Sequence, residues 1–219
     1  MSPTFVKVCG LRSPEDAEKL EGLDVTAAGL IFVPGRHRQV TPEEGAAIAA
    51  HLPRGVLKAG VFINPTQKEL LSVLDQVPLD LIQLHGEESP QFCEWLKEQG
   101  QVHVVKVFHM GESLPVSWEE YAPYIDAVLL DSSTGQKRGG TGKSFPWQWI
   151  PNEKKRWRRW ELPVWVAGGL SPDNVERLLQ EYAPDGVDVS GGVEMKGGKD
   201  RNKISQFVER VRQYDRQNH

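Results

Sequence analysis

The chain has 219 residues and a formal net charge of −4, and 39% of its residues are hydrophobic. This length corresponds to one large domain or two small ones, and the apolar content excludes an intrinsically disordered chain. Thirty acidic residues against 26 lysines and arginines leave no general attraction for nucleic acid or anionic lipid. The longest apolar run, residues 27–33, is far shorter than the roughly 20 residues of a membrane span.

The N-terminal segment and the cysteines indicate an intracellular protein. The first residues do not combine a basic stretch with a following apolar stretch, so we expect no export signal. Two cysteines, Cys9 and Cys93, are too few for a disulfide scaffold, and neither belongs to a Cys-x-x-Cys pair. We therefore expect a soluble, cytoplasmic domain of enzyme size, with no nucleic-acid partner and no membrane partner.

Short apolar, β-branched runs alternate with helix-like segments along the whole chain. Their spacing, about 22 to 36 residues from end to end, suits a strand followed by a crossover helix. The expected strands are Phe5–Cys9, Ala27–Phe32, Leu57–Ile63, Leu79–His85, Val102–His109, Ile125–Asp131, Pro163–Ala167 and Gly186–Ser190. Eight such units, with a last helix at about 201–215, predict an α/β fold: a single-domain (β/α)8 TIM barrel over residues 1–219. An open doubly wound sheet is the alternative.

Several helices begin with the same chemistry. Ser13, Thr41 and Ser171 each precede a proline and an acidic residue, the pattern of an N-cap hydroxyl with Pro at the first helical position. Ser89-Pro90 is a weaker copy. The segment 153–160 is basic with interleaved tryptophans, so it suits either a nucleic-acid or partner surface or the solvated face of an outer helix. We favour the outer helix, because one charge run in an acidic protein is a weak signal.

Strand side chains alternate between the barrel interior and the helix layer. This pattern predicts a set of polar side chains that point inward, most of them near the carboxyl ends of their strands. The set is Lys7, Cys9, Lys58, Asn64, Gln83, His85, Asp131, Asp188 and Ser190. Barrel enzymes carry their active sites at that end. Lys7 would need a carboxylate partner there, and its charge would favour a Cys9 thiolate. The alternative for Cys9 is a small buried hydrophobe.

Three glycine-rich segments follow the sixth, seventh and eighth strands. They are Gly139–Lys143, with Gly140 and Gly142; Gly168–Ser171, with Gly169; and Ser190–Glu194, with Gly191 and Gly192. Glycine lets backbone N–H groups approach an anion, and loops at this end of a barrel often hold phosphate. None has Walker A spacing. The segments predict a phosphorylated small-molecule ligand, with ordinary tight turns as the alternative.

Arginine and histidine residues lie on the same rim. Arg36 and Arg38 follow the second strand, where a guanidinium can hold a carboxylate through two hydrogen bonds; an exposed surface role is the alternative. Of the six histidines, His85 and His109 fall at strand ends. Sparse acidic residues and the lack of a second cysteine at ligand spacing argue against a zinc site, and we expect no metal.

Seven short motifs resemble those of a known family, cover almost the whole chain and occur in the order that they have in that family. They are Lys7-Val8-Cys9-Gly10-Leu11, Gly60-Val61-Phe62-Ile63-Asn64, Gln83-Leu84-His85-Gly86, Leu129-Leu130-Asp131, Gly139-Gly140-Thr141-Gly142-Lys143, Ala167-Gly168-Gly169-Leu170 and Gly186-Val187-Asp188-Val189-Ser190. This set closely resembles phosphoribosylanthranilate isomerase of tryptophan biosynthesis. The resemblance implies a (β/α)8 barrel, no cofactor, and an Amadori rearrangement of N-(5-phosphoribosyl)anthranilate to 1-(2-carboxyphenylamino)-1-deoxyribulose 5-phosphate.

The resemblance also implies roles for particular residues. Cys9 corresponds to the family's general base, Asp131 to its general acid, and Arg38 to the arginine that binds the anthranilate carboxylate. Desolvation would keep Asp131 protonated, and nearby positive charge would ionise Cys9. The remaining expected substrate-binding residues are those of the glycine segments and the inward polar set: His85, Gly140, Gly142, Gly168, Gly169, Asp188, Ser190, Gly191 and Gly192.

Two departures from the family pattern bear on the site. An arginine, Arg36, stands where the family often has serine, so it competes with Arg38 for the carboxylate role. The eighth-strand loop reads Ser190-Gly191-Gly192 where Ser-Ser-Gly is commoner, which still leaves backbone donors for a phosphate.

Other functions remain open on the residues alone. The related sugar isomerase of histidine biosynthesis uses two carboxylates, so Cys9 argues against it, as does the lack of similarity between the two halves of the chain. A non-catalytic barrel that binds a phosphorylated ligand would explain the glycine loops but would not need Cys9 and Asp131. The oligomeric state is expected to be a monomer or a homodimer.

Overall fold

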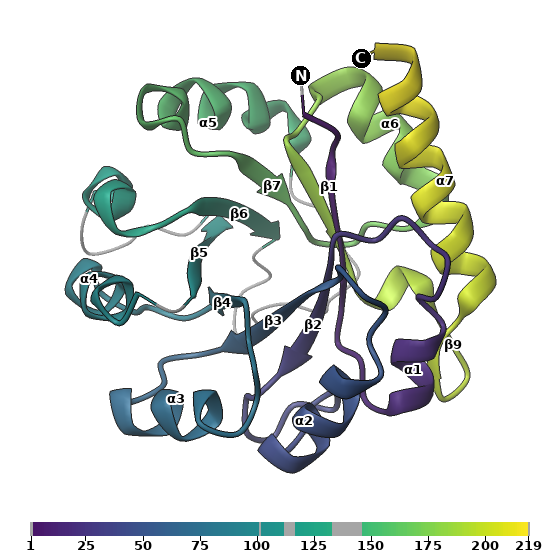
Figure 1. Ribbon diagram of the computed structural model, residues 1–219. Coiled ribbons are helices and arrows are strands. Elements are labelled where there is room, and N and C mark those ends of the chain that lie inside the picture. Colours follow the sequence, from purple (N-terminus) through teal and green to yellow (C-terminus); the bar gives the residue numbers. More distant parts are fainter. Residues whose placement is uncertain (1, 101, 112–116, 133–145, 219) are drawn as a thin grey trace.

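Eight parallel strands close into a barrel in the computed structural model, which describes residues 2–100, 102–111, 117–132 and 146–218. Figure 1 shows the strands as a ring with helices outside it. Each strand pairs with the next, and the last pairs with the first. The strands are β1 (Phe5–Cys9), β2 (Ala27–Ile31), β3 (Leu57–Phe62), β4 (Leu81–Leu84), β5 (His103–Met110), β6 (Ala127–Ser132), β7 (Val164–Val166) and β8 (Gly186–Val189). The predicted fold is confirmed, and closure excludes the open sheet.

Seven α-helices cover the barrel within the described residues. They are α1 (Pro14–Glu18), α2 (Pro42–Ala50), α3 (Gln67–Leu74), α4 (Pro90–Glu98), α5 (Ile150–Trp157), α6 (Pro172–Tyr182) and α7 (Arg201–Asn218). Short 3-10 helices η1 (Trp118–Tyr124), η2 (Trp147–Trp149), η3 (Arg158–Trp160) and η4 (Gly191–Val193) and a hairpin of β9 (Glu194–Met195) and β10 (Gly198–Lys199) complete the structure. Across these described helices, none has the length and apolar character that a bilayer span requires.

The expected N-caps are where the sequence places them. Ser13, Thr41, Ser89 and Ser171 are the N-caps of α1, α2, α4 and α6, each with proline in the first turn. Thr66 caps α3 in the same way, through a capping box with Glu69, although no proline marks it in the sequence. These caps satisfy backbone donors at the helix ends that follow the strands.

The barrel has two apolar cores, and the inward face of β3 differs from the expectation. One core lies between strands and helices, and the other fills the interior. Ala59 belongs to the interior core, and Val61 and Ile63 line the cavity above it, so these residues face inward. The expectation that Lys58 points inward is therefore wrong. The alternation was assigned in the wrong phase because both faces of a buried barrel strand are apolar.

The basic segment 153–160 lies on α5 and η3. Trp157 is fully buried and stacks on Phe108 with ring centroids 5.2 Å apart. Arg156 pairs with Glu119 and with Glu153 on the outside. Tryptophan inside and cations outside is the arrangement of an outer helix, which supports that interpretation.

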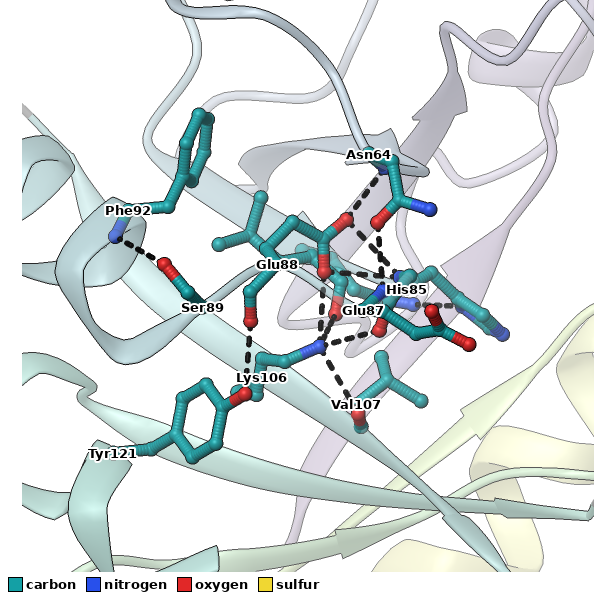
Figure 2. A network of polar contacts seen from close by, with 12 residues as sticks. Asn64, His85, Glu87, Glu88, Ser89, Phe92, Lys106, Val107 and Tyr121 are labelled. Carbon is teal, nitrogen blue, oxygen red and sulfur yellow. Dashed lines mark hydrogen bonds and ion pairs between the residues drawn. The ribbon is translucent and has the colours of Figure 1, made fainter. Parts of the chain in front are cut away.

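A buried ion pair braces the ends of β4 and β5. The side chains of Lys106 and Glu88 are 0% and 1% exposed, and Nζ lies 2.9 Å from Oε2. Figure 2 shows Nζ of Lys106 at the centre of this network. It donates to the carbonyl oxygen of Gly86 at 2.8 Å, while Glu88 accepts from the backbone N–H groups of Gly86 and Asn64. The turn that carries His85 is thus held from both sides.

We predict that Lys106→Met destabilises the protein by about 3–5 kcal/mol, because it leaves the Glu88 carboxylate buried without its partner. Lys58→Met is the matched control, since the Lys58–Asp80 pair has side chains that are 27% and 37% exposed and is expected to contribute less than about 1 kcal/mol. Urea unfolding of both variants measures the difference. Equal losses would show that burial does not control the strength of the Lys106 pair.

Candidate active site

A cavity of about 860 Å³ opens at the carboxyl ends of the strands. Its lining includes every described residue that the sequence and the resemblance selected for the site: Cys9, Arg38, His85, Asp131, Gly168, Gly169, Asp188, Ser190, Gly191 and Gly192. Gly140 and Gly142 lie outside the described residues. The structure therefore brings together side chains that are up to 183 positions apart in the chain.

Cys9 lies above a buried ion pair that joins the first and last strands. Nζ of Lys7 lies 2.9 Å from Oδ2 of Asp188, and the two side chains are 1% and 7% exposed. This pair supplies the carboxylate that an inward Lys7 requires. Burial raises the pKa of the Cys9 thiol, and the opposing charge and hydrogen bond of Lys7 do not compensate. The expectation that positive charge ionises Cys9 is therefore not met, because desolvation is the larger effect and favours the thiol.

Asp131 is buried and has partners on both carboxylate oxygens. The backbone N–H of Ser132 donates to Oδ1 at 2.7 Å, and Nε2 of His85 lies 3.3 Å from Oδ2. Burial raises the pKa of Asp131, but hydrogen bonding to His85 and the charges of His85 and His109 outweigh it and leave that pKa below its ordinary value. This direction is opposite to the expected protonation of Asp131 by desolvation, because the two imidazoles favour the carboxylate.

Arg38 is held by a carboxylate that sequence reasoning missed. Its Nε and Nη2 lie 2.6 and 2.8 Å from the two oxygens of Glu194, which also accepts from Nζ of Lys199 at 2.8 Å. Arg36 lines the same cavity but is exposed. The signal for Glu194 was its place as the last residue of the third glycine segment, at the end of a loop that lies on the rim.

The glycine segments after β7 and β8 pack on each other. A Cβ on Gly192 would lie 2.0 Å from the carbonyl oxygen of Leu170, so only glycine permits this contact. Gly168 has φ +87°, and a Cβ there would lie 2.6 Å from Oγ of Ser132. The two loops therefore expose adjacent stretches of backbone to the cavity, and α6 begins directly after one of them.

Comparison with known proteins decides what this arrangement belongs to. The family model for N-(5'phosphoribosyl)anthranilate (PRA) isomerase matches residues 6–210. The chain belongs to this family. It is 37% identical over 214 residues to the N-(5'-phosphoribosyl)anthranilate isomerase of Brevibacillus brevis, covering 97% of this chain and 95% of the relative. It is 39% identical to that of Azotobacter vinelandii, covering 97% and 99%.

Solved structures of phosphoribosylanthranilate isomerases share the fold. The enzyme from Thermus thermophilus superposes with a TM-score of 0.80 at 32% identity, covering 96% of this chain and 99% of that one. A phosphoribosylanthranilate isomerase in complex with reduced 1-(o-carboxyphenylamino)-1-deoxyribulose 5-phosphate has a TM-score of 0.77 at 31% identity, with the same coverage. The resemblance drawn from the motifs is confirmed: the chain is an isomerase of this family.

Glu194 provides a test of the rim electrostatics. Its pKa is lowered to about 2: burial raises it, but the hydrogen bonds and charges of Arg38 and Lys199 outweigh that effect. A carboxylate with a depressed pKa stabilises the fold above its unfolded pKa, near 4.5, and loses that contribution as the pH falls toward its folded value. We predict that Glu194→Gln lowers stability at pH 7 by on the order of 2 kcal/mol.

The difference between wild type and Glu194→Gln should shrink as the pH falls below about 4.5. Thermal unfolding at a series of pH values measures it, with Glu209→Gln as the control because Glu209 is exposed in the middle of α7. A difference that stays constant down to pH 3 would contradict the assigned ion pairs.

Proposed function

We propose that this chain isomerises N-(5'-phosphoribosyl)anthranilate to 1-(2-carboxyphenylamino)-1-deoxyribulose 5-phosphate, with Cys9 as general base and Asp131 as general acid. One observation carries the assignment of these roles. A thiol from β1 and a carboxylate from β6, separated by β7 and β8, line one cavity together with the glycine loops and Arg38. An acid, a base and two anion-binding regions are what an aminoaldose with a phosphate and a carboxylate requires.

The reaction proceeds through ring opening, removal of the C2′ proton and tautomerisation, and Asp131 and Cys9 carry the first two proton transfers. Asp131 donates a proton to the furanose ring oxygen; the bond from this oxygen to C1′ breaks, and the nitrogen lone pair forms a C1′=N bond. The Cys9 thiolate then removes the proton from C2′, and the electron pair of that C–H bond forms an enolamine. The enolamine gains a proton at C1′ and loses one from the C2′ hydroxyl, which produces the ketose.

The pKa shifts of Asp131 and Cys9 run opposite to what the reaction requires, since the pKa of Asp131 is lowered and that of Cys9 is raised. Asp131 favours its carboxylate and Cys9 its thiol. Bound substrate would exclude water from Asp131, and desolvation favours the protonated acid. His85, 3.3 Å away, is placed to exchange a proton with Asp131. The charges of Lys7 and Lys199 both lower the pKa of Cys9 and stabilise the thiolate when it forms.

Two anion sites orient the substrate in this proposal. The backbone around Gly168, Gly169, Gly191 and Gly192 binds the phosphate, with Ser190 beside it, while Arg38 binds the anthranilate carboxylate. Glu194 holds Arg38 through Nε and Nη2, which leaves both N–H groups of Nη1 and the second N–H of Nη2 for the substrate. Binding energy at both ends of the substrate fixes the reacting centre between Cys9 and Asp131.

The proposal treats residues 1–219 as one domain whose partner is a phosphorylated small molecule. The complex of a related isomerase with a reduced, phosphorylated compound supports this partner. Dimeric phosphoribosylanthranilate isomerase of Thermotoga maritima has been converted to monomers. Both states therefore occur for this fold, and we propose that this protein is a monomer or a homodimer. We propose that the protein works in the cytoplasm without a nucleic-acid partner.

The catalytic roles predict a particular kinetic pattern. Asp131→Asn removes the proton donor and is expected to lower kcat by about 100- to 10,000-fold while KM changes little. Cys9→Ser should be similarly impaired, because a serine hydroxyl is a far weaker base. The measurement is the decay of substrate fluorescence, with the substrate formed in situ from anthranilate and phosphoribosyl pyrophosphate by its transferase. Wild type that binds phosphorylated ligands but leaves the fluorescence unchanged would favour the non-catalytic barrel.

The carboxylate role separates the two rim arginines. Arg38→Met is expected to raise KM by about 10- to 100-fold, since a charge-assisted hydrogen bond contributes about 1.5–3 kcal/mol. Arg36→Met is the matched control and should change KM by less than about threefold, because Arg36 is exposed. The same fluorescence assay measures both. A larger effect at Arg36 would transfer the carboxylate role to that residue.

A further inference from the structure

Three potential metal ligands converge at the ends of adjacent strands. His85 follows β4, His109 lies on β5 and Asp131 lies on β6, where it is the register partner of His109. The ligand atoms of the three side chains all lie within 4.8 Å of one another. All three side chains are largely buried, His85 being the most exposed at 12%.

The spacing suits a small divalent ion. Ligand atoms on a tetrahedral ion with bonds of about 2.0–2.1 Å are roughly 3.3 Å apart. Nε2 of His85 and Oδ2 of Asp131 already have this separation, 3.3 Å. His109 packs beside His85 with ring centroids 4.9 Å apart, and no two ligand atoms of the three residues are more than 4.8 Å apart. Closing the longest of these distances to about 3.3 Å therefore needs a movement of at most roughly 1.5 Å.

Each candidate ligand also has an outer partner that orients it. Nε2 of His109 lies 3.1 Å from the carbonyl oxygen of His85; when it donates there, Nδ1 carries the lone pair. The side-chain Nε2 of Gln83 lies 3.4 Å from Nδ1 of His85. Rotating this amide by half a turn would place Oε1 there to accept from Nδ1, which leaves Nε2 of His85 for an ion. The N–H of Ser132 occupies Oδ1 of Asp131 and leaves Oδ2. Metal-binding histidines in proteins typically have such second hydrogen bonds.

We propose that His85, His109 and Asp131 form a binding site for a divalent transition-metal ion, with Zn²⁺ or Co²⁺ as the fitting class. Two imidazoles and one carboxylate are a ligand set that these ions accept. The fourth position would face the cavity, which His85 and Asp131 line. Spacing along the chain did not indicate this site, because each ligand comes from a different strand.

Occupancy of the site would inhibit the isomerase. An ion on Oδ2 of Asp131 replaces the proton that this residue delivers, and it lies where the substrate binds. This consequence rests on the proposed role of Asp131, whereas binding of the ion does not. The inference therefore has one test that needs turnover and one that does not.

The binding test uses the full chain after treatment with a chelator. We expect Co²⁺ to bind with one ion per chain, a visible absorption of tetrahedral cobalt and no sulfur-to-cobalt charge-transfer band. His109→Gln should weaken binding at least tenfold, and Asp131→Asn provides a second variant that removes a different ligand. His51→Gln is the matched control, because His51 is exposed at the end of α2. Cys9→Ser should bind as wild type does.

The activity test titrates Zn²⁺ against each variant, with every rate divided by that variant's own metal-free rate. We expect wild type and His51→Gln to be inhibited at the same concentration, and His109→Gln to need at least tenfold more Zn²⁺. Wild type that binds no Co²⁺, or binding that is equal in wild type and His109→Gln, would overturn the site. The cobalt spectrum does not require turnover, so this failure is distinct from a failure of the proposed acid role.

Discussion

The ion pair between Lys7 and Asp188 is the interaction on which barrel and site both depend. The two residues are register partners on β1 and β8, the strands whose pairing closes the sheet. Their charges are buried, so neither residue can remain in the interior without the other. The same pair lies beneath Cys9, and its ammonium group opposes the cost of ionising that thiol. The same ion pair therefore helps to close the barrel and sets the charge environment of the proposed base, Cys9.

A similar balance applies around the mouth of the barrel. Burial alone would raise the pKa of Asp131, but His85 and His109 favour its carboxylate. Arg38 would have freedom to swing on an exposed loop, but Glu194 and Lys199 fix it over the cavity. Lys106 and Glu88 hold the turn of His85 in the same manner. Asp131, Arg38 and the turn of His85 are thus each held by groups from other segments, so these side chains lose less conformational freedom when substrate binds.

Local patterns in the sequence were sufficient for the elements of the fold. The eight apolar runs correspond to β1–β8, and four Ser-Pro or Thr-Pro pairs correspond to the starts of helices. The inward face of β3 was the failure. Both faces of β3 carry apolar residues, so the alternation along the strand could not show that Ala59 and Val61 face the interior. Only their packing against neighbouring strands decided which face points inward. Thr66 is a different case: Thr66 and Glu69 have the spacing of a capping box, but a pattern that requires proline after the hydroxyl does not detect it.

The sequence by itself determined the barrel, the family and the strand ends from which a catalytic thiol and acid would come, because these depend on local periodicity and short motifs. Only the tertiary structure decided the charge state of those groups and their partners. A pKa depends on burial and on charges a few ångströms away, and those charges come from residues such as Lys7, His85 and His109 on other strands. The Glu194 carboxylate on Arg38 is 156 positions away in the chain, and the fold alone brings the two together.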